Sequence, residues 1–169
     1  MNVQFDQVCH ERKLPNFTLF PRIFSFRISS SIDIDAESEH AWSLIENAAK
    51  WPEWSEVCTE VWNIPNDGVL TDGAKFGFKL RMAAKEVPFN VTVTRIDNGL
   101  LIEWRSTKFS ITAVRTITVE PNGEGCRVTD AKDFSSPFLP VGVVYPRGLI
   151  RRMTESWLAD MKIASESKG

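Results

Sequence analysis

Apolar and polar residues alternate along most of this chain. In residues 24–34 the apolar positions are Phe24, Phe26, Ile28, Ile32 and Ile34, with polar residues between them. A period of two is typical of a β-strand with one buried face. The same pattern predicts six further strands, which we place at residues 57–64, 75–82, 87–93, 100–106, 111–119 and 126–134. Turn signals such as Asn98-Gly99 separate them, so the strands should be mostly antiparallel.

Two other segments have helical spacing. Asp35 is a suitable N-cap for a helix that carries Ala41 and Trp42, and we expect Trp51-Pro52 to close it before a short second helical turn. Near the C-terminus, apolar residues recur with the i, i+3, i+4, i+7 spacing of one helix face. They are Leu149, Ile150, Met153, Trp157, Met161 and Ala164.

These elements predict an α+β fold, in which one long helix covers part of a curved sheet. The rest of the concave face is then either filled by large side chains or left as a pocket. The composition favours an apolar filling or lining, because 11 Phe and 6 Trp stand beside a single Tyr.

Length and charge narrow the class of protein. The chain has 169 residues and a net charge of −2, which suits one globular domain and argues against nucleic-acid binding. We assign residues 24–169 to that domain and residues 1–23 to an N-terminal extension. No apolar run reaches the roughly 20 residues that a membrane span needs, so we expect no stable membrane insertion.

The cysteines and histidines give no metal or cofactor signal. Cys9, Cys58 and Cys126 are far apart and lack CxxC spacing, which favours reduced thiols and a cytoplasmic location. His10 and His40 are isolated. We therefore predict neither a metal site nor a cofactor.

Three polar residues interrupt the apolar strand faces. Arg115 falls among the apolar residues of 111–119, and Asp130 and Lys132 share a face with Val128 and Phe134. One interpretation is a satisfied Arg115–Asp130 ion pair of little net stabilising effect, or a bulge that turns both side chains outward. The other is that Arg115 orients a carboxylate, phosphate or carbonyl of an otherwise apolar ligand.

A basic group, Arg147, Arg151 and Arg152, lies beside the uncharged stretch 137–146. It is interpreted as a solvated helix face, or alternatively as a contact with an anionic membrane surface during ligand loading.

The order of elements and several local strings resemble the START-like superfamily (SRPBCC, helix-grip fold), and within it the polyketide cyclase/dehydrase-like group. The resemblance covers about residues 24–166. Its strings are IDIDA at 32–36, AWSLI at 41–45, WPEW at 51–54, LTDGAKF at 70–76, VEP at 119–121, GCRVT at 125–129 and FSSP at 134–137.

The resemblance implies a helix-grip fold, with a curved seven-stranded antiparallel sheet around the long C-terminal helix and two short helices after the first strand. It also implies a deep cavity for apolar or amphipathic small molecules. The family tends to place a histidine at position 115, and a histidine and a glutamate at positions 130 and 132. Arg115, Asp130 and Lys132 depart from that pattern, so an imidazole-based acid/base role is not carried over.

We therefore expect a protein that binds or carries a lipid- or polyketide-like small molecule. The alternative is a polyketide cyclase or dehydratase in which Arg115 polarises a carbonyl and Asp130 moves a proton; a protein-interaction module is a third possibility. Catalysis itself is left open. The candidate ligand-binding residues are Phe76, Phe78, Leu80, Met82, Phe89, Val91, Ile102, Trp104, Arg115, Ile117, Asp130, Lys132, Phe134, Ile150, Met153 and Trp157.

Overall fold

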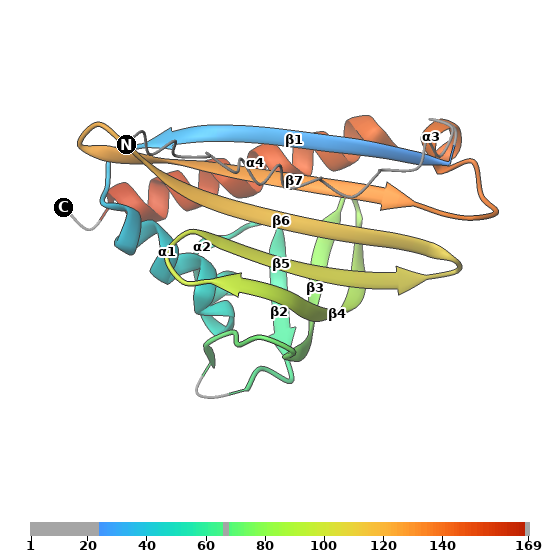
Figure 1. The fold of residues 1–169 in the computed structure, drawn as a ribbon, viewed down its shortest axis with the longest axis horizontal. Coiled ribbons are helices and arrows are strands. Elements are labelled where there is room, and N and C mark those ends of the chain that lie inside the picture. Colours follow the sequence, from blue (N-terminus) through green and yellow to red (C-terminus); the bar gives the residue numbers. More distant parts are fainter. Residues whose placement is uncertain (1–23, 66–67, 168–169) are drawn as a thin grey trace, which may run out of the picture.

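The computed structural model describes residues 24–65 and 68–167, so the predicted extension 1–23 lies outside the described residues. Seven strands form one antiparallel sheet in the order β1-β7-β6-β5-β4-β3-β2 (Figure 1). The strands are β1 (Ser25–Ile34), β2 (Cys58–Trp62), β3 (Lys75–Met82), β4 (Lys85–Asp97), β5 (Leu101–Lys108), β6 (Ile111–Asn122) and β7 (Gly125–Ser135).

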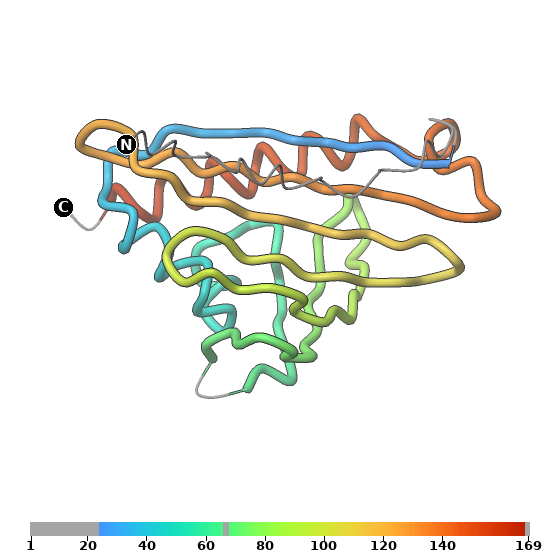
Figure 2. The backbone as a smooth tube through the Cα atoms, viewed as in Figure 1, coloured from blue at the N-terminus to red at the C-terminus, as the bar shows by residue number. Residues whose placement is uncertain are grey.

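The helices lie against one face of this sheet. The long helix α4 (Arg147–Glu166) runs alongside β1 and β7, as Figures 1 and 2 show. At one end it meets α1 (Ser38–Glu46), which is followed by a 3₁₀ turn (Ala48–Lys50) and by α2 (Trp51–Trp54). At the other end lies the short helix α3 (Val141–Val144), which the sequence pattern did not predict. The predicted α+β helix-grip architecture is confirmed.

The ends of the first helix differ from the prediction. Glu37, not Asp35, is the N-cap of α1, and its side chain makes no capping hydrogen bond. The prediction that Trp51-Pro52 closes this helix is also wrong, because α1 ends at Glu46 and Trp51 begins α2. Proline is tolerated in the first turn of a helix, where its missing N–H has no intrahelical partner.

The hairpin β6–β7 is longer than expected. The two strands were predicted at 111–119 and 126–134, but Pro121 also pairs with Cys126 and Asn122 with Gly125. Only Gly123 and Glu124 remain in the turn, where Gly123 has a φ of 66° that favours glycine. The pairing runs from Thr112–Ser135 to this turn without a register shift, so it holds Arg115 and Lys132 side by side.

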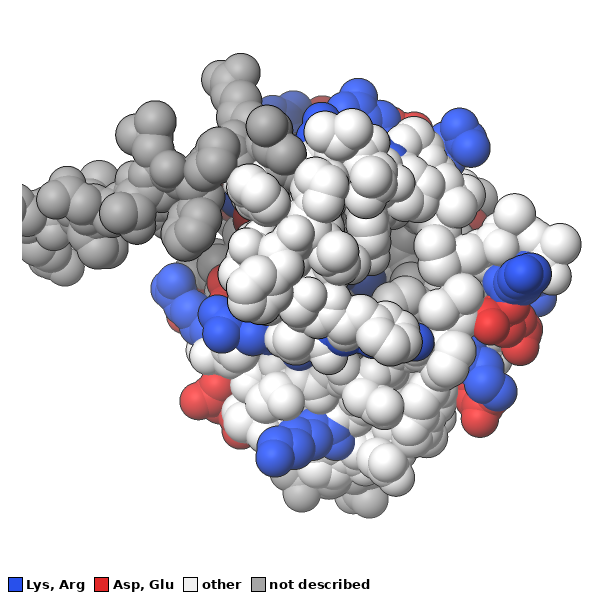
Figure 3. Space-filling model, turned by 90° about the vertical axis from the view of Figure 1, so that its right-hand side faces the viewer, with Lys and Arg blue, Asp and Glu red and all other residues white. Residues whose placement is uncertain are grey.

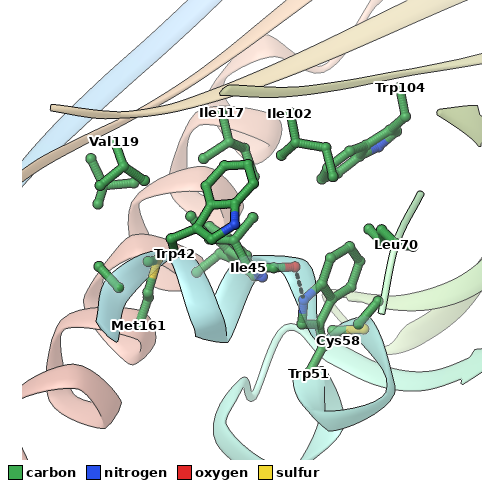
Figure 4. Close-up of a cluster of buried hydrophobic side chains, with 14 of the residues drawn as sticks. Trp42, Ile45, Trp51, Cys58, Leu70, Ile102, Trp104, Ile117, Val119 and Met161 are labelled. Atoms are coloured by element: carbon green, nitrogen blue, oxygen red, sulfur yellow. Dashed lines mark hydrogen bonds between the residues drawn. The ribbon is translucent and has the colours of Figure 1, made fainter. Parts of the chain in front are cut away.

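The space between the sheet and α4 is solid at the end that α1 and α2 cover, here called the packed end. Figure 4 shows Trp42 and Ile45 of α1 between the strands and Met161 of α4. The indole N–H of Trp51 donates a hydrogen bond to the carbonyl of Ile45 at 3.0 Å, which ties α2 to α1. Ile45, Met161 and the sheet residue Ile117 are fully buried. Large side chains therefore fill this half of the concave face.

Candidate functional site

A cavity of about 110 Å³ lies between the sheet and the N-terminal half of α4, away from α1. Figure 3 looks onto this end of the molecule and shows a hollow surrounded by uncharged residues. Most of the lining is apolar. The lining residues are Val57, Phe78, Leu80, Met82, Phe89, Val91, Trp104, Ser106, Ala113, Arg115, Lys132, Phe134, Tyr145, Ile150, Met153, Thr154 and Trp157.

Arg115 and Asp130 form a bidentate ion pair beside this cavity. The Nε and Nη2 atoms of Arg115 donate to Oδ1 and Oδ2 of Asp130 at 3.0 and 2.7 Å. Arg115 is 8% exposed and Asp130 is 0% exposed. The prediction of an ion pair is confirmed, and the alternative of an outward-turning bulge is wrong, because β6 and β7 pair in continuous register.

Two indole rings hold the guanidinium of Arg115 in place. Its Cζ lies 5.1 Å from the ring centre of Trp104 on β5 and 4.4 Å from that of Trp157 on α4. A cation between two aromatic faces is attracted to both of them. The planar group is therefore fixed in orientation by the sheet and the helix together.

Lys132 connects the pair to α4. Its Nζ donates to Oδ2 of Asp130 at 2.7 Å and to Oγ1 of Thr154 at 2.8 Å. The Thr154 hydroxyl in turn donates to the carbonyl of Ile150 at 2.8 Å. The threonine oxygen therefore accepts a hydrogen bond from the lysine, and each of Arg115, Asp130, Lys132 and Thr154 is hydrogen-bonded to another member of this polar cluster.

Burial and neighbouring charges shift the pKa values of the cluster. Burial opposes ionisation of Asp130, but the charges of Arg115 and Lys132 outweigh it and hold the pKa of Asp130 below its usual value. Burial and then the charge of Arg115 lower the pKa of Lys132 to about 8, although Asp130 opposes this shift. At neutral pH the cluster thus contains two cations and one anion.

The structure divides the predicted ligand-binding residues into three groups. Phe76, Ile102 and Ile117 belong to the hydrophobic core and do not border the cavity. Asp130 is buried behind Arg115 and Lys132 and does not border it either. The twelve that line the cavity are Phe78, Leu80, Met82, Phe89, Val91, Trp104, Arg115, Lys132, Phe134, Ile150, Met153 and Trp157.

Five lining residues were missed by the sequence reasoning: Val57, Ser106, Ala113, Tyr145 and Thr154. The sequence pattern indicated the position of three of them. Thr154 follows Ile150 by four residues and precedes Trp157 by three, so it lies on the apolar face of the helix as a polar exception. Ala113 shares the inward face of its strand with Arg115. Ser106 likewise shares the inward face of its strand with Trp104. For Val57 and Tyr145, only the folded structure shows the position.

The surface around the cavity end combines exposed apolar and basic residues. Phe109, Phe138, Val143 and Val144 are each more than 65% exposed. Lys108, Arg147, Arg151 and Arg152 are exposed near them in sequence, and Figure 3 shows Lys and Arg side chains around this end. Among the described residues, no helix is both long and apolar enough to cross a membrane.

Comparison with known proteins gives one family. The family model described as "Polyketide cyclase / dehydrase and lipid transport" matches residues 25–164. Among curated protein sequences, none matches this chain.

Solved structures share the fold at low sequence identity. The major latex-like protein 151 of Panax ginseng is 12% identical over 84% of this chain and 98% of its own, with a TM-score of 0.71. The Zhui aromatase/cyclase of a Streptomyces species is 9% identical over 85% of this chain and 95% of its own, with a TM-score of 0.71. A norcoclaurine synthase point mutant from Thalictrum is 16% identical over 86% of this chain and 97% of its own, with a TM-score of 0.63.

Proposed function

Because this chain belongs to the family of polyketide cyclases, dehydrases and lipid-transport proteins, we propose that it binds or carries an apolar or aromatic small molecule between the sheet and α4. The observation that carries the proposal is the cavity, whose mainly apolar wall is interrupted by one cluster of oriented polar groups. Small-molecule sites have this design, in which apolar walls supply affinity and a few polar groups supply orientation.

The cavity volume limits the size of a ligand that can bind without rearrangement of the lining. Its volume of about 110 Å³ is below the roughly 300–1,000 Å³ of most ligand pockets, so a larger ligand has to displace lining side chains. Met82 and Met153 are half-buried members of the lining. Methionine has three flexible bonds and adapts its shape easily. We expect these two side chains to move when a ligand binds.

Thermal unfolding tests the proposal. A panel of fatty acids, sterols and polyphenols is added to the protein, and a ligand at about 100 times its Kd should raise the Tm by roughly 5–10 °C. The panel contradicts the proposal if no compound shifts the Tm.

A pair of neighbouring substitutions shows where a ligand binds. Ala113→Trp fills the cavity and should abolish the shift. Its control is Val114→Trp, on the opposite face of the same strand, which should leave the shift unchanged. An equal shift in wild type and Ala113→Trp contradicts binding in this cavity.

A second candidate function is cyclase or dehydratase chemistry in the same cavity. It is favoured by Lys132, an ammonium group at the cavity wall whose pKa of about 8 suits proton transfer near neutral pH. Asp130 is a poor candidate for the proton-moving group, because Arg115 and Lys132 occupy its carboxylate oxygens and separate it from the cavity.

The test of this second function uses aromatic polyketide-like substrates. Turnover that is lost in Lys132→Met while substrate binding persists supports it. If Lys132→Met keeps full turnover, groups other than Lys132 carry out the proton transfer.

A further inference from the structure

The cavity wall carries an excess of positive charge. Of its lining residues within the described chain, Arg115 and Lys132 are the charged ones, and both are cationic at neutral pH. Their counter-ion, Asp130, lies behind them and has no exposed surface. Two cations with one carboxylate leave a net charge of +1, and the cationic side of the cluster is the side that faces the cavity.

Both cations have hydrogen-bond donors left over. An ammonium group has three N–H donors, and Lys132 uses one on Asp130 and one on Thr154. A guanidinium has five, and Arg115 gives the Nε donor and one Nη2 donor to Asp130. Within residues 24–65 and 68–167, the Nη1 group of Arg115 donates to no protein atom. The remaining donors are therefore available to a ligand.

An uncompensated cation in apolar surroundings is unfavourable unless an anion approaches it. The neighbouring polar residues of the wall, Ser106, Tyr145 and Thr154, are uncharged at neutral pH and cannot supply that anion. One negative charge on a ligand would neutralise the cluster. A planar carboxylate also fits the geometry of a guanidinium and can accept from the lysine at the same time.

We propose that the cavity selects amphipathic monoanions, in which an aromatic or aliphatic body fills the apolar part and a carboxylate contacts Arg115 and Lys132. This inference rests on the proposed ligand-binding function and adds the charge class of the ligand. An anionic group is favoured by the position of the two cations in front of Asp130, by their unused donors and by the net charge of the cluster.

Two ligands of nearly the same shape test the inference. Naphthalene-2-carboxylate and 2-acetylnaphthalene differ in that the first carries a carboxylate and the second a neutral methyl ketone. Their affinities are measured by isothermal titration calorimetry at pH 7. We expect the carboxylate to bind at least tenfold more tightly, because it alone compensates the buried charge.

A pair of lysine substitutions locates the effect. In Lys132→Met the cluster becomes neutral, and the ratio of the affinities for the carboxylate and the ketone should fall to near one. Lys108→Met removes the same charge from an exposed position at the end of β5 and should leave the preference unchanged. Lys132→Arg keeps the charge and should keep the preference.

The pH dependence of wild-type binding gives a test that needs no substitution. Lys132 loses its proton near pH 8, so the preference for the carboxylate should decrease from pH 7 to pH 9.5. The other groups that face Lys132 or Arg115 keep their charge over this range. Asp130 stays ionised because its pKa is held below the usual value, and burial raises the pKa of Tyr145 and raises that of Cys58 to about 11.

The outcomes separate this inference from the proposed function. Equal affinity for the two compounds, or tighter binding of the ketone, overturns the inference and leaves ligand binding in place. A preference that persists unchanged in Lys132→Met or at pH 9.5 also overturns it. If neither compound binds, the result counts against both proposals.

Discussion

The two ends of the space between the sheet and α4 share these two walls but differ in what fills them. At the packed end, α1 and α2 insert Trp42, Ile45 and Trp51 against the strands. At the cavity end no comparable helix among residues 24–65 and 68–167 covers the sheet, and the wall includes a hydrogen-bonded charged cluster. The difference teaches that an extra layer of helices, and not the sheet, determines whether the concave face becomes core or cavity.

The largest effect is expected from disturbing the buried charges of the cavity end. Asp130→Asn leaves Arg115 and Lys132 without their anion, and we expect it to reduce the free energy of unfolding by about 3–5 kcal/mol. The matched control is Asp133→Asn on the same strand, which breaks an exposed pair with Arg27 and should cost less than about 1 kcal/mol. Urea unfolding measures both. If the two variants lose similar free energies of unfolding, the buried cluster contributes no more to stability than an exposed ion pair.

A pair of methionines on α4 compares the two ends directly. Met161 is fully buried at the packed end, and Met161→Ala should cost about 2–5 kcal/mol, because it leaves an empty space among close-packed side chains. Met153 borders the cavity eight residues earlier, and Met153→Ala should cost about 1 kcal/mol or less. A Met153→Ala variant as unstable as Met161→Ala would mean that the cavity end is packed as tightly as the other.

The smallest change per measured step is a pH dependence, counted per pH unit, that belongs to the cavity end. The folded pKa of Lys132 is about 8 against an ordinary value of 10.5, so between these values the unfolded chain binds more protons than the folded one. The contribution of Lys132 to stability therefore increases as pH rises from about 8 to about 10.5, by at most about 1.4 kcal/mol per pH unit.

Urea unfolding of wild type and Lys132→Met across this pH range measures that contribution as their difference. If the free energy of unfolding changes with pH in the same way in both proteins, the lowered pKa of Lys132 is contradicted.

Much of the fold could be predicted from the sequence, because strand and helix periods are local properties of the chain. The strand β3 was predicted with its observed bounds, Lys75–Met82, and Arg115 lies inward, as one of the two open interpretations required. The errors lie where local rules compete. Trp51-Pro52 was assigned as a helix end, yet burial of Trp51 among Phe76, Phe78 and Trp104 accompanies a new helical turn there.

The ring-rich composition was a correct signal of an apolar interior, but it did not distinguish core from cavity. Phe76 and Phe78 alternate with the same period on the same strand, and only Phe78 borders the cavity. Their patterns are identical because periodicity records which face a residue occupies and not how far along the sheet it lies. What covers each position depends on elements that are distant in sequence.

The sequence by itself determined most of the elements, the α+β architecture and the mainly apolar strand faces that Arg115, Asp130 and Lys132 interrupt. Only the tertiary structure decided that α1 and α2 fill one end, that Asp130 lies behind the two cations, and that Thr154 of α4 completes the cluster. The physical reason is that side-chain direction follows from local backbone geometry, whereas depth and partners follow from how the sheet curves and where the helices dock on it.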